Sequence, residues 1–219
     1  MAGTVAPNIV TDGLVLYLDA ANPNSYISGS TTWRNMVGSN NGTLINGPTY
    51  NSANGGSIVF DGVDDYVLIN DGIYSINGGT LNIWFKRSGT TNTIIGSYGG
   101  SGNQRTPTFY RNVSNIGWEF GSLIARNTGI SFTDNTWFNM SMTFNGSFNV
   151  NVYINSILTN TETSLNPISF WNQFVVGRYG NFGSSYAKGN FSMVQVYNRA
   201  LSASEILQNY NATKSRFGL

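Results

Sequence analysis

Two glycine-rich segments of the sequence place aromatic rings beside amide and guanidinium groups. An aromatic ring can pack on the apolar face of a sugar, while amides and arginine bind its hydroxyl groups, so these segments predict a glycan site. Two alternatives stay open: the rings could cap the ends of the fold, or they could form a protein interface rich in aromatic residues and arginine. The candidate residues are Tyr98, Asn103, Arg105, Tyr179, Asn181 and Phe182.

One acidic cluster stands out, formed by Asp61, Asp64, Asp65 and Asp71. Carboxylate oxygens beside a glycine turn are ligands that a calcium ion could use. The alternative is turn chemistry, because an aspartate followed by Gly62 is a preferred hairpin turn between two apolar strands. We expect no cofactor, with calcium at this cluster as the alternative.

Catalytic residues are scarce, because the sequence has no cysteine and no histidine. Their absence removes disulfides, thiol nucleophiles and the commonest general base. A retaining glycosidase needs two carboxyl groups roughly 5 Å apart, whereas Glu119, Glu162 and Glu205 each lack an acidic neighbour in the sequence. We therefore predict that the protein is not an enzyme.

Charged residues make up only 10% of the chain, and the formal net charge is +1. Lysine and arginine are scattered, so we expect no nucleic-acid partner. No run of about 20 apolar residues is present, so we expect no membrane partner. The first twenty residues have no basic start, and their longest apolar run is Leu14–Leu18. We expect synthesis in the cytoplasm without a signal peptide.

Short apolar runs recur between clusters of glycine, asparagine and aspartate, which predicts an all-β fold of two packed antiparallel sheets. The clearest strands are residues 137–145 and 148–155, where apolar and polar residues alternate on either side of a turn at Gly146-Ser147. The polar face of this hairpin, rich in asparagine and serine, is either solvated or ligand-facing. The tryptophans are expected in the core. Further predicted strands are residues 14–18, 57–60, 66–69, 80–87, 93–97, 108–112, 116–120, 173–177 and 189–197.

A single helical signal lies near the C-terminus. Ser202 and Glu205 have the spacing of a capping box, and Leu201 and Ile206 are placed as a hydrophobic staple, which predicts a short helix. Residues 211–219 then combine basic and apolar side chains, which could either pin the terminus to the sandwich or dock on a partner. We expect pinning.

Seven segments follow one another in an order and spacing that resemble the laminin G-like domains of the concanavalin A-like lectin/glucanase superfamily. The resemblance covers nearly the whole chain and is greatest to stand-alone copies in tailed-phage virion proteins. The segments are GLVLYLDAANPNSY, WRNMVGSNNGTLINGPTY, SIVFDGVDDYVLI, TLNIWFKRS, WFNMSMTFNGSFNVNVYINSIL, FVVGRYG and GNFSMVQVYNRALSASEILQNYNATKSRFGL.

This resemblance implies a single domain over residues 1–219, a two-sheet antiparallel jelly-roll sandwich with a concave sheet, and a helix and tail from about residue 201. Many relatives carry an acidic residue on the last long strand, where the superfamily often holds structural calcium. The matching positions here are Ser192 and Met193. This departure argues against calcium binding of the family type.

The resemblance also implies a function in binding. The first expectation is a non-enzymatic virion protein of a tailed phage, a capsid decoration or accessory protein that contacts other virion proteins and presents a surface to host glycans. Self-association into a homo-oligomer is a further expectation. The alternative is a carbohydrate-binding adhesin or lectin module, and the third interpretation is a degenerate glucanase.

Overall fold

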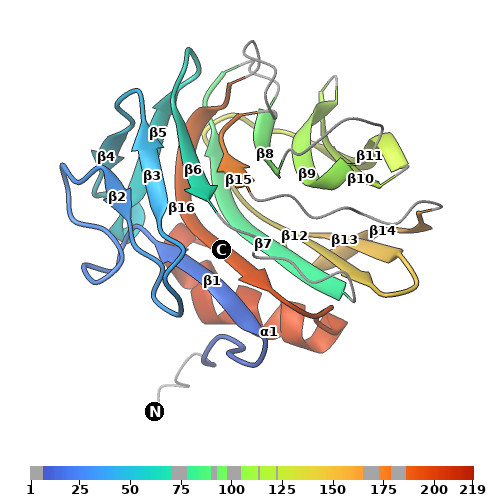
Figure 1. Cartoon of the computed structure of the whole chain (residues 1–219). Helices are drawn as coiled ribbons and strands as arrows, with labels where there is room; N and C mark the ends of the chain where they lie inside the picture. Colours follow the sequence, from blue (N-terminus) through green and yellow to red (C-terminus); the bar gives the residue numbers. More distant parts are fainter. Residues whose placement is uncertain are drawn as a thin grey trace, which may run out of the picture.

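The strands of the computed structural model form two antiparallel sheets that face each other across one apolar core (Figure 1). Within the described residues each sheet has eight strands, and one helix follows the last strand. The predicted jelly-roll sandwich is therefore confirmed. No described helix has the length and hydrophobicity that a membrane span requires. The structure describes residues 7–70, 78–89, 93–97, 105–112, 114–121, 123–164, 173–178 and 186–219.

The first sheet is built around its two longest strands, which pair with each other at its centre. The strand β1 (Leu14–Asp19) pairs with the second half of β16 (Lys188–Tyr197), and β5 (Ser57–Asp61) pairs with the first half. The strands in spatial order are β14 (Ile157–Thr163), β13 (Asn149–Ile154), β12 (Trp137–Asn145), β7 (Gly78–Arg87), β16 (Lys188–Tyr197), β5 (Ser57–Asp61) and β4 (Thr49–Asn51), with β1 (Leu14–Asp19) beside β16.

The second sheet covers the other side of the core. Its buried side chains include Trp33, Val67, Phe109 and Trp118, all of which belong to the main apolar cluster. The strands in spatial order are β11 (Leu123–Ser131), β10 (Asn115–Gly121), β9 (Arg105–Asn112), β8 (Thr93–Ser97), β15 (Gln173–Val176), β6 (Tyr66–Asn70), β3 (Gly42–Ile45) and β2 (Thr32–Trp33).

The hairpin of β12 and β13 follows from the alternation in its sequence. Successive side chains point to opposite faces of a strand, so every second residue enters the core. In the register of the pair, Met140 lies opposite Ile154, and Met142 lies opposite Val152, and all four are buried. A single slipped residue would expose this whole set, which fixes the register.

The helix α1 (Ala203–Thr213) and the 3-10 turn η2 (Lys214–Phe217) pack on the outer face of the first sheet. The capping box is present, because the Ser202 hydroxyl accepts from the backbone N–H of Glu205 and the Glu205 carboxylate accepts from the backbone N–H of Ser202. Figure 1 shows α1 beneath β1, β7 and β16. The buried Phe217 ring stacks on Trp84 at 4.0 Å between ring centroids, so the expected pinning of the terminus is confirmed.

The polar face of the hairpin is buried at Asn139, Ser141 and Thr143 on β12, contrary to both alternatives, whereas on β13 Asn149 is exposed and Asn151 is half-buried. Asn139 and Ser141 are each 1% exposed. Their side chains both donate to the Asn82 amide oxygen, at 2.8 and 2.7 Å, and the Asn82 amide donates to Gln195 at 2.6 Å. Buried polar groups need partners, and this network across β12, β7 and β16 supplies them to Asn139, Ser141 and Asn82 inside the first sheet.

Candidate functional site

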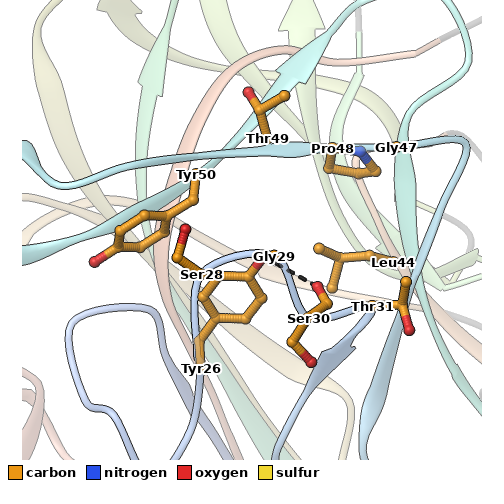
Figure 2. Close-up of a pocket in the computed structure, with 10 residues that line it drawn as sticks. All are labelled: Tyr26, Ser28, Gly29, Ser30, Thr31, Leu44, Gly47, Pro48, Thr49 and Tyr50. Atoms are coloured by element: carbon orange, nitrogen blue, oxygen red, sulfur yellow. Dashed lines mark hydrogen bonds between the residues drawn. The ribbon is translucent and has the colours of Figure 1, made fainter.

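The candidate site is a pocket at the edge of the sandwich, where the chain passes from β3 of the second sheet to β4 of the first sheet. It has a volume of about 380 Å³, within the range of small-molecule sites. Its walls come from the β1–β2 loop, β3, the β3–β4 turn and β4 (Figure 2). The lining residues are Tyr26, Ser28, Gly29, Ser30, Thr31, Leu44, Gly47, Pro48, Thr49 and Tyr50.

Two tyrosine rings form one side of the pocket. The centroids of Tyr26 and Tyr50 lie 5.5 Å apart, with their planes tilted by 32°. Tyr26 is buried, and its hydroxyl donates to the backbone carbonyl of Ser30 at 3.1 Å, whereas Tyr50 is half-buried. Burial raises the pKa of Tyr26 above its ordinary value, so this hydroxyl stays a donor. Tyr26 is therefore a fixed support, and Tyr50 is the ring that a ligand can reach.

The other side of the pocket is apolar, and Figure 2 shows the buried Leu44 and Pro48 across from the two rings. The turn before Pro48 is tight, with positive φ angles of 67° at Asn46 and 97° at Gly47. A Cβ atom added at Gly47 would meet no atom within 4 Å, so this glycine faces open space rather than a packed neighbour. The pocket thus has apolar walls and accessible backbone at its mouth.

The rim of the pocket carries free hydroxyl groups. Ser28, Thr31 and Thr49 are exposed, and their hydroxyls have no hydrogen-bond partner among the described residues. Ser30 differs, because its hydroxyl donates to the carbonyl of Thr32 and accepts from its N–H. None of the ten described lining residues is charged. The arrangement is suited to a small, uncharged, polyhydroxylated ligand with one apolar face.

Sequence reasoning did not identify this pocket, because its residues come from two segments that carry no charge and no cluster of glycines. The two tyrosines, each near turn residues, were the available signal. Of the predicted glycan residues, Tyr98, Asn103, Tyr179, Asn181 and Phe182 lie outside the described residues. Arg105 begins β9, and its side chain is not among those described. The glycan prediction for those loops stays a prediction.

A second aromatic group lies on β6 and beside β15. The Arg178 guanidinium lies 4.1 Å from the centroid of the Tyr66 ring, and the rings of Tyr66 and Tyr186 are 6.4 Å apart. A cation over an aromatic face gains roughly 0.5–2 kcal/mol, so this contact fixes the backbone bridge between Arg178 and Tyr186. It supports the end of the second sheet and is separate from the pocket.

The acidic cluster is brought together by the structure. Carboxylate oxygens of Asp61, Asp64 and Asp65 all lie within 4.8 Å of one another. Asp71 lies outside the described residues. Burial, followed by the charges of its two neighbours, raises the pKa of Asp65 to about 6. These three carboxylates are the described groups that could hold a metal ion.

The turn after Asp61 differs from the prediction in one respect. The Asp61 carboxylate accepts from the N–H of Val63 at 2.7 Å, and Gly62 has a φ angle of 83°, as turn chemistry requires. However, the strands on either side are not a hairpin, because β5 belongs to the first sheet and β6 to the second. The turn carries the chain from one sheet to the other.

The three glutamates lie on three separate elements, β14, the first turn of α1 and β10. Glu162 forms an ion pair with Arg126 at 2.7 Å, which links the edge strands β14 and β11. Glu205 caps α1 and contacts Arg199 at 2.6 Å, and this arginine lowers the pKa of the Glu205 carboxyl to about 2. Glu119 lies on β10 and is 8% exposed.

The four described tryptophans, Trp33, Trp84, Trp118 and Trp137, are buried as predicted, and Trp171 lies outside the described residues.

Comparison with solved structures shows which known folds are similar to that of this chain. Trypanosoma rangeli sialidase in complex with sialic acid is similar over 97% of this chain, with 15% identity and a TM-score of 0.75. The chain spans 36% of that sialidase. Domain 4 of an extracellular arabinanase from Geobacillus stearothermophilus, in complex with arabinotriose, is similar over 90% of this chain and 98% of its own length. Its identity is 18%, and its TM-score is 0.66.

Sequence comparison defines the family. No curated protein sequence matches the chain significantly. A laminin G family model, described as the concanavalin A-like lectin/glucanases superfamily, matches residues 61–207. Since this match covers more than half of the sequence, the chain belongs to the laminin G-like family of the concanavalin A-like lectin/glucanase superfamily.

Proposed function

We propose that this domain is a non-catalytic carbohydrate-binding module that takes one unit of a neutral saccharide in the pocket between β3 and β4. The observation that carries the proposal is the lining of that pocket. It combines the accessible ring of Tyr50, apolar walls, and the free hydroxyls of Ser28, Thr31 and Thr49, without any charged group. The arabinotriose complex of the similar arabinanase domain supports a neutral sugar as the class of ligand.

The absence of charge argues for neutral over acidic sugars. A buried or half-buried carboxylate loses most of its hydration and needs a charged or multiply donating partner. The polar groups of the ten lining residues are hydroxyls and backbone groups only. A sialic or uronic acid would therefore bind more weakly than the neutral sugar of the same shape.

A screen on a glycan array, followed by calorimetric titration of the best ligand, tests this proposal. Tyr50→Ala should lower the affinity at least tenfold, because it removes the ring that packs on the sugar. Tyr50→Phe keeps the ring and should stay within a few fold of the wild type. Tyr66→Ala, which removes a ring from the separate group near Arg178, should leave the affinity unchanged. Equal affinity of Tyr50→Ala and wild type would contradict the proposed site.

Binding without turnover is part of the same proposal. It is supported by the ion pair of Glu162 with Arg126 and by the hydrogen bonds of Glu205 in the helix cap. Incubation with laminarin, agarose or alginate should release no reducing ends. Release that disappears in Glu119→Gln, Glu162→Gln or Glu205→Gln would show that the domain is an enzyme.

A second candidate is a structural role in a tailed-phage particle, as a capsid decoration or accessory protein. The exposed apolar pair Ile157 and Leu158, 69% and 51% exposed at the edge strand β14, favours a protein contact. An edge strand with exposed apolar side chains offers a surface for pairing with another chain. Mass spectrometry of purified particles tests this role, and Ile157→Ser with Leu158→Ser should reduce incorporation. Detection of the protein only outside particles would contradict it.

A further inference from the structure

The Arg216 guanidinium lies in a ring of oxygen atoms that come from three separate segments of the chain. Its Nη1 donates to Oδ1 of Asp19 at 2.7 Å, and its Nε donates to the carbonyl of Asn54 at 2.7 Å. Its Nη2 donates to the carbonyl of Gly56 at 3.0 Å and to the Ser192 hydroxyl. One carboxylate, two carbonyls and one hydroxyl thus converge on a single positive group.

These oxygens are also held by contacts that do not involve the arginine. The Asp19 carboxylate accepts from the N–H of Ala21 at 2.9 Å, and the Ser192 hydroxyl donates to the carbonyl of Gly56 at 2.6 Å. A Cβ atom at Gly56 would lie 2.4 Å from the carbonyl oxygen of Ala20, so only glycine permits this close approach of the two segments. The oxygen ring is therefore built into the end of β1, the β4–β5 connection and β16.

The charge at this place is largely removed from water. The side chains of Arg216 and Asp19 are 19% and 10% exposed. A carboxylate with so little hydration needs a cation beside it. Carboxylate, carbonyl and hydroxyl oxygens are the donors that calcium prefers, and a guanidinium satisfies the same oxygens through directed N–H donors.

The family resemblance implies structural calcium at the last long strand, and the residues here do not fit that ion. The position on β16 is Ser192, which contributes no charge, and the arginine fills the space between the oxygens. We infer that Arg216 is a built-in cation: it occupies a cation site of the sandwich and makes the fold independent of a divalent metal at that place.

Thermal melting of the full chain tests this inference in a background with Asp61→Asn and Asp64→Asn, which leaves Asp65 as the one carboxylate of the three that could hold a metal ion. In this background the melting temperature should be the same in calcium and in chelator. Arg216→Ala with Ser192→Asp empties the ring and adds a second carboxylate. This variant should melt lower in chelator and should regain on the order of 5 °C in saturating calcium, with one calcium bound per chain by calorimetry.

A matched control places the same charge outside the ring. Arg216→Ala with Ser147→Asp has the same net charge, but Ser147 is exposed in the turn between β12 and β13 and not beside the four oxygens, so calcium should give no recovery. The inference is wrong if calcium raises the melting temperature of the chain with Arg216 intact and Asp19→Asn abolishes that rise. It is also wrong if the variant Arg216→Ala with Ser192→Asp folds but its melting temperature does not rise in calcium.

A second pair of variants tests whether the oxygen ring requires a cation, even if the variant Arg216→Ala with Ser192→Asp does not fold. Arg216→Lys retains a cation, whereas Arg216→Met retains a long side chain without charge. The lysine variant should melt higher than the methionine variant, because its ammonium can approach the same oxygens. Equal melting temperatures would show that the ring does not require a cation.

Discussion

Replacing Phe217 by alanine tests how strongly the C-terminal segment stabilises the sandwich. The ring is 6% exposed and stacks on Trp84 at 4.0 Å and against Trp137 at 4.7 Å between centroids. Deleting a buried phenylalanine side chain costs about 3–5 kcal/mol of unfolding free energy. In a domain of this size each kcal/mol lowers the melting temperature by roughly 2–4 °C. We therefore expect a fall of about 6–20 °C in calorimetry or circular dichroism.

The control for this variant lies two residues further on. Leu219 is 45% exposed, so Leu219→Ala should change the unfolding free energy by no more than about 0.5 kcal/mol. Truncation after Asn211 should lower the melting temperature as well, because it removes Phe217 together with Thr213, which accepts from the Trp84 indole at 3.0 Å. If Phe217→Ala and Leu219→Ala both have the melting temperature of the wild type, the terminal segment is not packed on the first sheet as described.

Three further predictions concern the cap of α1 and two carboxyl groups. Ser202→Ala should lower the unfolding free energy by about 1 kcal/mol in urea titrations, since the hydroxyl accepts from the N–H of Glu205; no loss would mean that the cap is redundant. Arg199 and Ser202 hold the Glu205 pKa at about 2 in the folded protein against an ordinary 4.5, so its stabilisation is present above pH 4.5 and should be lost as the pH falls toward 2. Glu205→Gln should show less of this acid dependence, and an unchanged profile would contradict the assignment. The Asp65 carboxyl has the opposite effect on the pH dependence of stability, because burial raises its pKa from 3.8 to about 6. The unfolding free energy should therefore rise as the pH falls from about 6 to 3.8, by at most about 1.4 kcal/mol per pH unit. Asp65→Asn should remove that rise.

The sequence was most informative where local signals agree with packing. The alternation in residues 137–155 predicts the hairpin of β12 and β13, and the spacing of Ser202 and Glu205 predicts the start of α1. Both signals come from residues close together in the sequence: the first marks a face that the fold buries, and the second marks the start of a helix. Short strands such as β2 and β4 carry no such alternation, because two or three residues are too few to show a period.

Long-range placement could not be predicted from the same patterns. Polar residues on one face of β12 indicate an exposed face, yet Asn139 and Ser141 are buried because both donate to Asn82 on β7. The pocket was missed for a related reason: Tyr26 and Tyr50 are 24 positions apart in the sequence and meet only because β4 and the β1–β2 loop lie at the same edge of the sandwich. The contacts of Arg216 with Asp19 also join opposite ends of the chain.

Mapping of ligand-induced shifts by ¹H–¹⁵N nuclear magnetic resonance gives the most direct test of carbohydrate binding at the pocket. The saccharide selected on the array is titrated into the labelled full chain. We expect saturable shifts of the amide signals of Gly29, Thr31, Gly47 and Tyr50, with the acidic turn at Asp64 and the helix α1 unaffected. Saturable shifts confined to another face, or no shift with any neutral saccharide at millimolar concentration, would contradict the proposed function.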